Sequence, residues 1–258
     1  MGGAFFEPLG EGRFRSTEHT NGPWAEGSQH LGPPSALLTR ALEAVPAAVP
    51  AMITRITVEI LGPVPVAELA VSAAVERPGR SVELLSGEIR AGGRAVVRGR
   101  AWRIVRSDSS SVLAGQPAPI EPPERAGAVQ RPEGWGTGYL DAMEWRSLRG
   151  SFAGPGPATI WARQQVDLVA GETPTGLQRL LTVADSGNGV SNRLDPRHWW
   201  FINTELTVHI YREPAGEWIG IDANTVIGPD GVGAALSTLH DRSGPVAAGA
   251  QSLMVRPR

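Results

Sequence analysis

Residues 199–212 read WWFINTELTVHIYR and contain the clearest strand pattern of the chain. From Glu205 onward polar and apolar residues alternate as far as Ile210. Side chains alternate between the two faces of a strand, so this pattern predicts a strand with one buried and one exposed face. Asn203 comes just before it, next to two tryptophans.

The rest of the chain predicts two groups of strands, each preceded by one helix. The first helix covers residues 34–45 and ends before Pro46. The second covers residues 174–186, with Thr173 as its N-cap, Pro174 as its first residue and Gly187 as its stop. The predicted strands are 53–61, 66–76, 82–90 and 95–105 after the first helix, and 204–212, 218–226, 233–239 and 246–255 after the second. Further strands are predicted at 143–148 and 159–169, and near the start at 4–6 or 13–15.

A weak internal repeat relates the two groups. Thr57-Val58-Glu59-Ile60 resembles Thr207-Val208-His209-Ile210 at a spacing of 150 positions (207 − 57), and Gly93 matches Gly244 at one position more. The larger spacing aligns Arg100 with Gln251. Because the order of elements agrees as well, we interpret the chain as a duplicated unit of one helix and a four-stranded antiparallel meander. This predicts an α+β fold, a tandem (double) hot-dog with two helices each wrapped by an antiparallel β-sheet.

The predicted domains are an N-terminal hot-dog at residues 1–106 and a C-terminal hot-dog at residues 139–258. Residues 107–138, rich in Ser, Pro and Gly, form the predicted linker between them. Free sheet edges favour pairing between chains, so we also expect a homo-oligomer.

Composition excludes several classes of protein. With 24 Lys and Arg against 26 Asp and Glu, the chain lacks the basic excess expected of a partner for nucleic acid or anionic membranes. The absence of cysteine excludes disulfides, thiolate metal sites and a thiol nucleophile, and the five histidines show no metal-ligand spacing. No apolar run is long enough for a membrane span and no signal peptide is evident, so we expect a cytoplasmic protein. There is no G-x-S-x-G elbow, Walker loop or complete G-x-G-x-x-G.

Four stretches resemble the type II acyl-CoA thioesterases, the double hot-dog family, in its actinobacterial-type branch. They are HLGPPSALLTRALE (30–43), LLTVADSGNGVSN (180–192), FINTELTVHIYREPAGEWIGIDANT (201–225) and GVGAALSTLHDRSGPVAAGAQSLMV (231–255). The resemblance implies hydrolysis of acyl-CoA without a cofactor. It also implies that the attacking water is activated by a triad of Asp185, Asn203 and Gln251. A shift of one residue would make Thr204 the middle member instead.

The residues themselves give partial support to these assignments. Asp185 falls in the last turn of the second helix, where the helix dipole disfavours a negative charge by about 0.3–1 kcal/mol. Gln251 shares strand parity with Leu253, which predicts a buried amide that requires partners. At the middle position, strict alternation favours Thr204 facing inward, whereas the ungapped alignment favours Asn203.

His30 and Gly32 are candidate ligand-binding residues, because free N–H groups at the start of a helix bind oxyanions. Pro33 and Pro34 have no N–H, which limits the donors at this helix start. We therefore keep a non-catalytic acyl-CoA binding protein as the alternative to a thioesterase. An acyl-CoA hydratase would need an Asp/His dyad at the start of a helix, and none is evident in the sequence.

Overall fold

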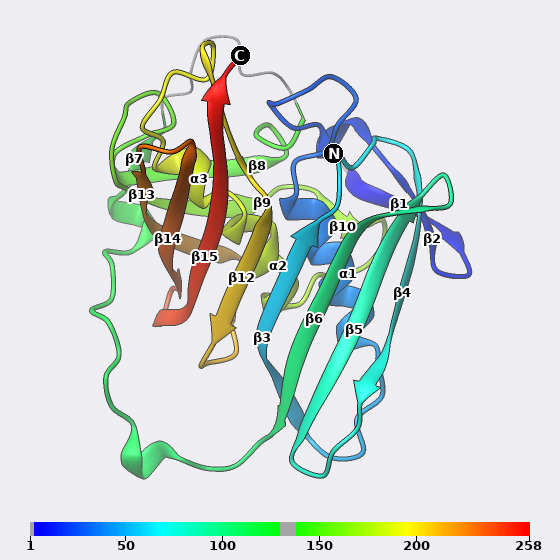
Figure 1. Cartoon of the computed structure of the whole chain (residues 1–258). Coiled ribbons are helices and arrows are strands. Elements are labelled where there is room, and N and C mark those ends of the chain that lie inside the picture. The colour runs from blue at the N-terminus through cyan, green and yellow to red at the C-terminus, as the bar shows by residue number, and fades with distance from the viewer. Residues whose placement is uncertain (1–2, 130–137) are drawn as a thin grey trace.

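A large β-sheet surrounds two helices in the computed structural model, which describes residues 3–129 and 138–258 (Figure 1). The strands before and within the linker are β1 (Ala4–Gly10), β2 (Arg13–Ser16), β3 (Ala51–Ile60), β4 (Glu68–Arg77), β5 (Val82–Ala91), β6 (Arg94–Val105) and β7 (Gly127–Ala128). The later strands are β8 (Met143–Arg149), β9 (Ala158–Gln164), β10 (Asp167–Val169), β11 (Trp199–Asn203), β12 (Glu205–Ile210), β13 (Trp218–Ile227), β14 (Val232–Asp241) and β15 (Gly244–Pro257). The helices are α1 (Gly32–Glu43), α2 (Gly176–Ala184) and the one-turn α3 (Gly187–Val190).

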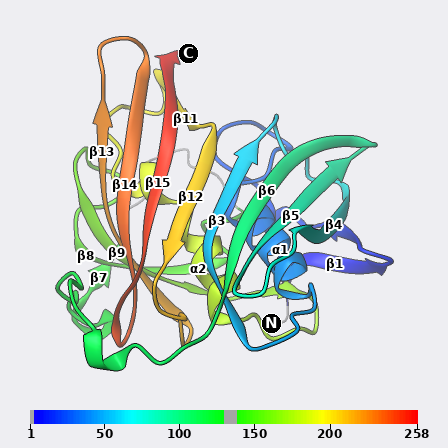
Figure 2. The same cartoon turned by 60° about the horizontal axis from the view of Figure 1, so that its bottom comes forward.

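The two halves share this sheet through β3 and β12, which lie side by side at its centre (Figure 2). The two strands are antiparallel, and Thr57 lies opposite Thr207 with the hydroxyl oxygens 3.1 Å apart. These threonines are equivalent in the internal repeat, so a local twofold axis passes between them. The predicted double hot-dog fold is confirmed.

The order of strands within each half differs from a simple meander. The sheet runs β4-β5-β6-β3 in the first half and β13-β14-β15-β12 in the second, so the first strand of each group lies beside the last. This places β3 and β12 in the middle of the sheet, where Ile56 and Val208 are completely buried. The apolar side chains of the alternating pattern therefore face the core, while exposed His209 lies on the opposite face of the sheet.

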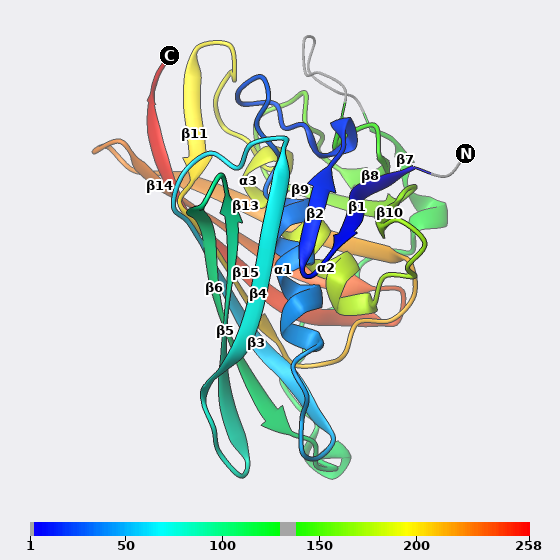
Figure 3. The same cartoon turned by 90° about the vertical axis from the view of Figure 1, so that its right-hand side faces the viewer.

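The helices α1 and α2 pack against each other on the same side of the sheet (Figure 3). The start of α2 differs from the prediction, because Thr175 is the N-cap in place of Thr173. Its hydroxyl accepts from Gln178 N, and the Gln178 side chain accepts from Thr175 N, which is a capping box. Pro174 therefore precedes the helix. At the other end Asp185 is the C-cap, and Gly187 begins α3 instead of a loop.

Other boundaries also depend on tertiary contacts. Both strands proposed as alternatives near the start form, as β1 and β2, and β10 separates from β9 to pair in parallel with β1. Part of the predicted linker, residues 130–137, lies outside the described residues. Within its described part, Trp161 Nε1 donates to the carbonyl oxygen of Glu121 at 2.8 Å, so this segment contacts the second half. The domain limits stay a prediction.

Leu206 tests whether the halves unfold together, because it is fully buried where they join and one core contains residues of both. Leu206→Ala should lower the free energy of unfolding by about 2–5 kcal/mol, through lost burial and the cavity left behind. Denaturant unfolding should remain one transition. The control His209→Ala, on the exposed face of the same strand, should change stability by about 0.5 kcal/mol or less. Two transitions of which only one moves would contradict a shared core.

Candidate active site

A buried polar cluster lies where α2 ends. Asp185, Asn203 and Gln251 come from the C-cap of α2, the last residue of β11 and the middle of β15, and are 4%, 7% and 3% exposed. Asp185 Oδ1 accepts a hydrogen bond from Asn203 Nδ2 at 2.8 Å and another from Gln251 Nε2 at 3.2 Å. Gln251 Nε2 also donates to the Asp185 carbonyl oxygen at 3.0 Å. The structure thus brings together three residues that are far apart in the sequence.

A β-bulge between β11 and β12 turns Asn203 toward this cluster. Asn203 pairs with Leu253 and Thr207 with Ala250. The interval from residue 203 to residue 207 is therefore one residue longer than the interval from 250 to 253 that it faces on β15. The extra residue reverses the parity that the sequence suggested. Thr204 is exposed, and its hydroxyl donates to a backbone carbonyl of β15 at 3.4 Å. The structure therefore places Thr204 outside the cluster, contrary to the expectation from strict alternation.

The first half contains the same bulge at the matching position. Between Ile53 and Arg55 the register of β3 against β6 shifts by one residue. The hydroxyl of Thr54 donates to the carbonyl oxygen of Trp102 at 3.3 Å, as Thr204 does in the second half. A threonine at this position thus closes the bulge in both halves, which gives Thr204 a structural role.

The repeat also shows what the first half carries at the positions of the cluster. Ile53 precedes its bulge as Asn203 does. The register of β6 on β3 and of β15 on β12 matches Ala101 with Gln251, so the alignment of Arg100 with Gln251 is wrong by one residue. Both counterparts on the strands are buried and apolar.

The helices share the sequence Leu-Leu-Thr-x-Ala at 37–41 and 180–184. In each helix the threonine hydroxyl donates to the carbonyl oxygen four residues earlier, at 2.8 Å in α1 and 2.9 Å in α2. This match places Leu42, which is fully buried, at the position of Asp185. The first half therefore has no polar counterpart of the cluster.

The start of α1 completes the site from the other half of the chain. His30 Nδ1 lies 3.2 Å from Asp185 Oδ2, and the backbone N–H of Gly32 donates to the same nitrogen at 3.0 Å. A Cβ on Gly32 would overlap the carbonyl oxygen of Thr182, so the close approach of the two helices requires glycine here. The sequence shows no Asp/His dyad, because these two residues meet only in the folded chain.

Tyr139 is a member of the site that the sequence analysis missed. Its ring stacks on His30 with 3.8 Å between ring centroids and 10° between planes. Its hydroxyl donates to the carbonyl oxygen of Thr182 at 2.8 Å and lies 2.9 Å from Ser186 Oγ. A single tyrosine directly after the predicted linker carries no signal of this role in the sequence.

Burial sets the protonation of this site. It raises the pKa of Asp185 to about 7, against the opposing effect of Asn203, Gln251 and the backbone N–H groups of Leu31 and Gly32. Burial also lowers the pKa of His30 to about 3, so the imidazole is neutral at physiological pH. A carboxylate with a pKa near the working pH has the protonation equilibrium that suits a general base.

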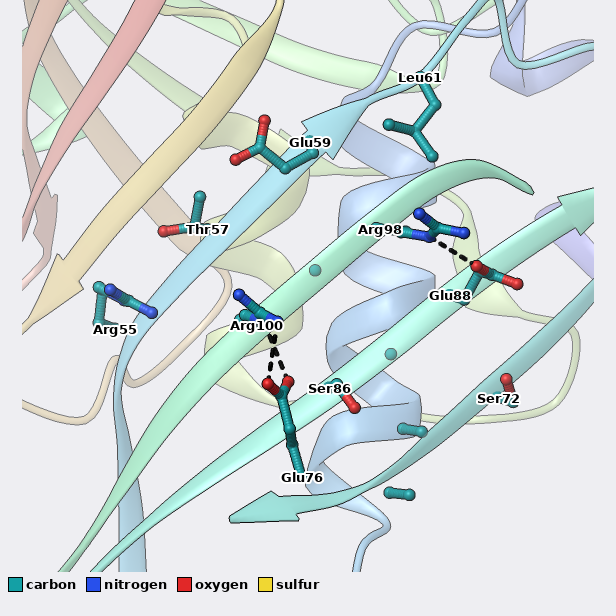
Figure 4. Close-up of a pocket in the computed structure, with 14 residues that line it drawn as sticks. Arg55, Thr57, Glu59, Leu61, Ser72, Glu76, Ser86, Glu88, Arg98 and Arg100 are labelled. Carbon is teal, nitrogen blue, oxygen red and sulfur yellow. Dashed lines mark hydrogen bonds and ion pairs between the residues drawn. The ribbon is translucent and has the colours of Figure 1, made fainter.

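A broad hollow of about 960 Å³ lies on the opposite face of the sheet, over β3 to β6 (Figure 4). Four of its charged side chains form ion pairs, Arg98 with Glu88 at 2.8 Å and Arg100 with Glu76 at 2.9 Å. The hollow is lined by none of the candidate residues Asp185, Asn203, Thr204, Gln251, His30 and Gly32. In the described part of the chain, no helix is long and apolar enough to cross a membrane, and no cluster of three potential metal ligands occurs.

Comparison with protein families gives a match in both halves. The acyl-CoA thioesterase N-terminal domain matches residues 20–104, and the acyl-CoA thioesterase C-terminal domain matches residues 121–255. The chain belongs to the acyl-CoA thioesterase family. No curated protein matches the sequence of this family member.

Solved structures share the fold of this thioesterase-family chain over nearly its full length. A putative thioesterase II from Thermobifida fusca YX aligns with a TM-score of 0.74 and 18% identity, covering 97% of this chain and 95% of that one. The acyl-CoA thioesterase II TesB2 from Mycobacterium marinum aligns with a TM-score of 0.68 and 14% identity, covering 98% and 95%. A hot-dog protein of unknown function from Alicyclobacillus acidocaldarius gives 0.75 and 16%, covering 96% and 95%.

Asp185→Asn should stabilise the fold in a pH-dependent way. The pKa of Asp185 is raised from 3.8 to about 7, so folding favours the protonated carboxyl. The contribution of this protonated carboxyl to the stability of the folded state is fully present below about pH 4 and is lost as the pH rises through 7. Asparagine resembles the protonated form at every pH. Its melting temperature should exceed that of the wild type by several degrees at about pH 8, and the difference should shrink toward about pH 4. A difference independent of pH would contradict the raised pKa.

Proposed function

We propose that this chain hydrolyses fatty acyl-CoA to the free acid and CoA, with Asp185 as the general base. The observation that carries the proposal is the buried carboxylate of Asp185, which has a pKa near 7 and two amide donors on one oxygen. Membership of the acyl-CoA thioesterase family supports acyl-CoA as the substrate. The reaction requires no cofactor.

The geometry gives the two amides a role in orienting the base. Gln251 Oε1 accepts a hydrogen bond from Asn188 N at 3.0 Å, which fixes the amide so that its Nε2 points to Asp185. Together with Asn203 it holds Oδ1, where the negative charge of the carboxylate is stabilised. In the proposed reaction Asn203 and Gln251 also orient the attacking water beside Asp185.

The proposed reaction proceeds by attack of water on the thioester. Asp185 takes one proton from water while the water oxygen bonds to the carbonyl carbon. The C–S bond then breaks, and the proton passes from Asp185 to the departing sulfur, which gives the acid and the CoA thiol. The N–H groups of Leu31 and Gly32 at the start of α1 donate to the Asp185 carboxyl, and Gly32 N–H also donates to His30 Nδ1, so they hold the base in place.

Two alternatives remain, and a contact in the structure supports one of them. A non-catalytic acyl-CoA binding protein would keep the fold without turnover. A hydratase would use an Asp/His dyad, and the contact between His30 and Asp185 provides such a pair. Thiol release from saturated acyl-CoA distinguishes hydrolysis from both, while loss of the absorbance of an enoyl thioester without thiol release would indicate hydration. The homo-oligomer and the cytoplasmic location stay predictions.

Asp185→Asn tests the base. Thiol release from a panel of acyl-CoAs should fall by about 10²–10⁴-fold, the usual contribution of general base catalysis. Affinity for acyl-CoA should change far less, because ground-state contacts lie elsewhere. The matched control is Glu43→Gln, at the end of α1, where Glu43 accepts from Gln178 Nε2 at 2.6 Å outside the cluster. Equal hydrolysis by Asp185→Asn and wild type would remove Asp185 from the mechanism.

The asymmetry of the halves predicts one active site per chain. Leu42, Ile53 and Ala101 cannot bind or activate water as the cluster in the second half can. Titration of Asp185→Asn with acyl-CoA in a calorimeter should therefore give one bound ligand per chain. Two equivalent ligands per chain would show that the apolar half also binds substrate.

A further inference from the structure

The two oxygens of the Asp185 carboxyl have different surroundings. Oδ1 receives N–H donors from Asn203 and Gln251. Oδ2 instead faces His30 Nδ1, a ring nitrogen, at 3.2 Å. The backbone N–H groups of Leu31 and Gly32 also donate to the carboxyl. A proton on Oδ1 would face the two amide donors, whereas a proton on Oδ2 faces a ring nitrogen that can accept it, so the proton belongs on Oδ2.

The hydrogen bonds of His30 indicate which ring nitrogen carries its proton. Gly32 N–H donates to Nδ1 at 3.0 Å, so Nδ1 has a lone pair and the proton of the neutral imidazole lies on Nε2. With Asp185 ionised, Nδ1 and Oδ2 are two acceptors that face each other, bridged by the shared Gly32 N–H. With Asp185 protonated, Oδ2–H donates to the single lone pair of Nδ1, and Gly32 N–H stays with the carboxyl oxygen.

The imidazole is held in this orientation by groups on both sides of Asp185 in the sequence. It stacks on Tyr139, whose hydroxyl is bonded to Thr182 and Ser186. The ring therefore has little freedom to turn away from Oδ2.

We propose that His30 is a positioning residue for Asp185. After Asp185 has taken a proton from water, His30 Nδ1 accepts a hydrogen bond from the protonated Oδ2 of that carboxyl. The inference rests on the proposed hydrolysis. His30 itself gains and loses no proton. It keeps the transferred proton on Oδ2, while Oδ1 stays with its two amide donors, until the proton passes to the departing sulfur.

The other titratable groups around the site do not replace this contact. Tyr139 stacks on the imidazole and bonds to Thr182 and Ser186. Glu205 follows Asn203 on the neighbouring strand, but its carboxylate accepts from the hydroxyl of Thr207 at 2.9 Å and from Ser252 N at 2.8 Å. The causes that set the pKa of Asp185 are burial and hydrogen-bond donors, none of them a charged side chain.

Two substitutions separate the effect of Nδ1 from the effect of the ring that stacks on Tyr139. His30→Phe keeps a ring to stack on Tyr139 but has no Nδ1, whereas His30→Asn loses the ring and keeps a polar acceptor near the position of Nδ1. For His30→Phe, kcat should fall about 10-fold or more with KM within about twofold, because the lost contact acts on the proton transfer. His30→Asn should recover part of kcat.

The pH profile gives the decisive readout. Without Nδ1 the protonated carboxyl loses its acceptor, and Gly32 N–H donates to the carboxylate alone, so both changes favour ionised Asp185. The acid limb of kcat/KM should therefore move to lower pH by about one unit in His30→Phe. An unchanged limb would mean a merely structural role, and a move to higher pH would mean that Nδ1 donates to Asp185; either result overturns the proposal.

An experiment on the wild type is independent of turnover. The ring nitrogens of ¹⁵N-histidine-labelled protein report protonation by NMR, and the signals of His30 are those missing from His30→Phe. Nδ1 should stay unprotonated from about pH 5 to 9, and its shift should follow the titration of Asp185 near pH 7 but not change with pH in Asp185→Asn. A protonated Nδ1 overturns the inference. If the wild type hydrolyses no acyl-CoA, the proposed function fails, while this spectrum still decides the contact.

Discussion

The pairing of β3 with β12 is the interaction on which the rest of the structure depends. It joins the two halves into one sheet, with equivalent threonines opposite each other, and it buries the apolar faces of both strands in a common core. Because the pairing is antiparallel around a local twofold axis, α1 and α2 pack side by side. The start of α1 thereby comes against the end of α2, and the site forms at that junction.

Duplication gives two positions with the same backbone, and side chains distinguish them. Both halves contain the bulge and the threonine that closes it. In the first half the cluster positions are apolar and buried, which stabilises the core. In the second half a carboxyl is buried among amides, and its ionisation is costly away from water. If the proposed hydrolysis takes place at this cluster, stability is given up for reactivity at one of two equivalent positions.

The first half nevertheless contributes to the site through His30 and Gly32. Neither residue lies in the half that carries the cluster, and their contact with Asp185 requires the two helices to approach closely. A site built across two halves depends on their relative placement. Substitutions at the junction of β3 and β12 therefore act on the geometry around Asp185 as well as on the core.

The sequence by itself determined most of the strands, the presence of the two long helices and the repeat, because periods of 2 and 3.6 are local properties of the chain. It also indicated Asp185 and Gln251, through helix position and strand parity. Only the tertiary structure shows that Asn203, and not Thr204, contacts Asp185, since a bulge is defined by the register against a neighbouring strand. The same holds for the helix cap at Thr175 and for the stack of His30 on Tyr139. Contacts between residues far apart in the chain depend on how the elements pack, which no local pattern encodes.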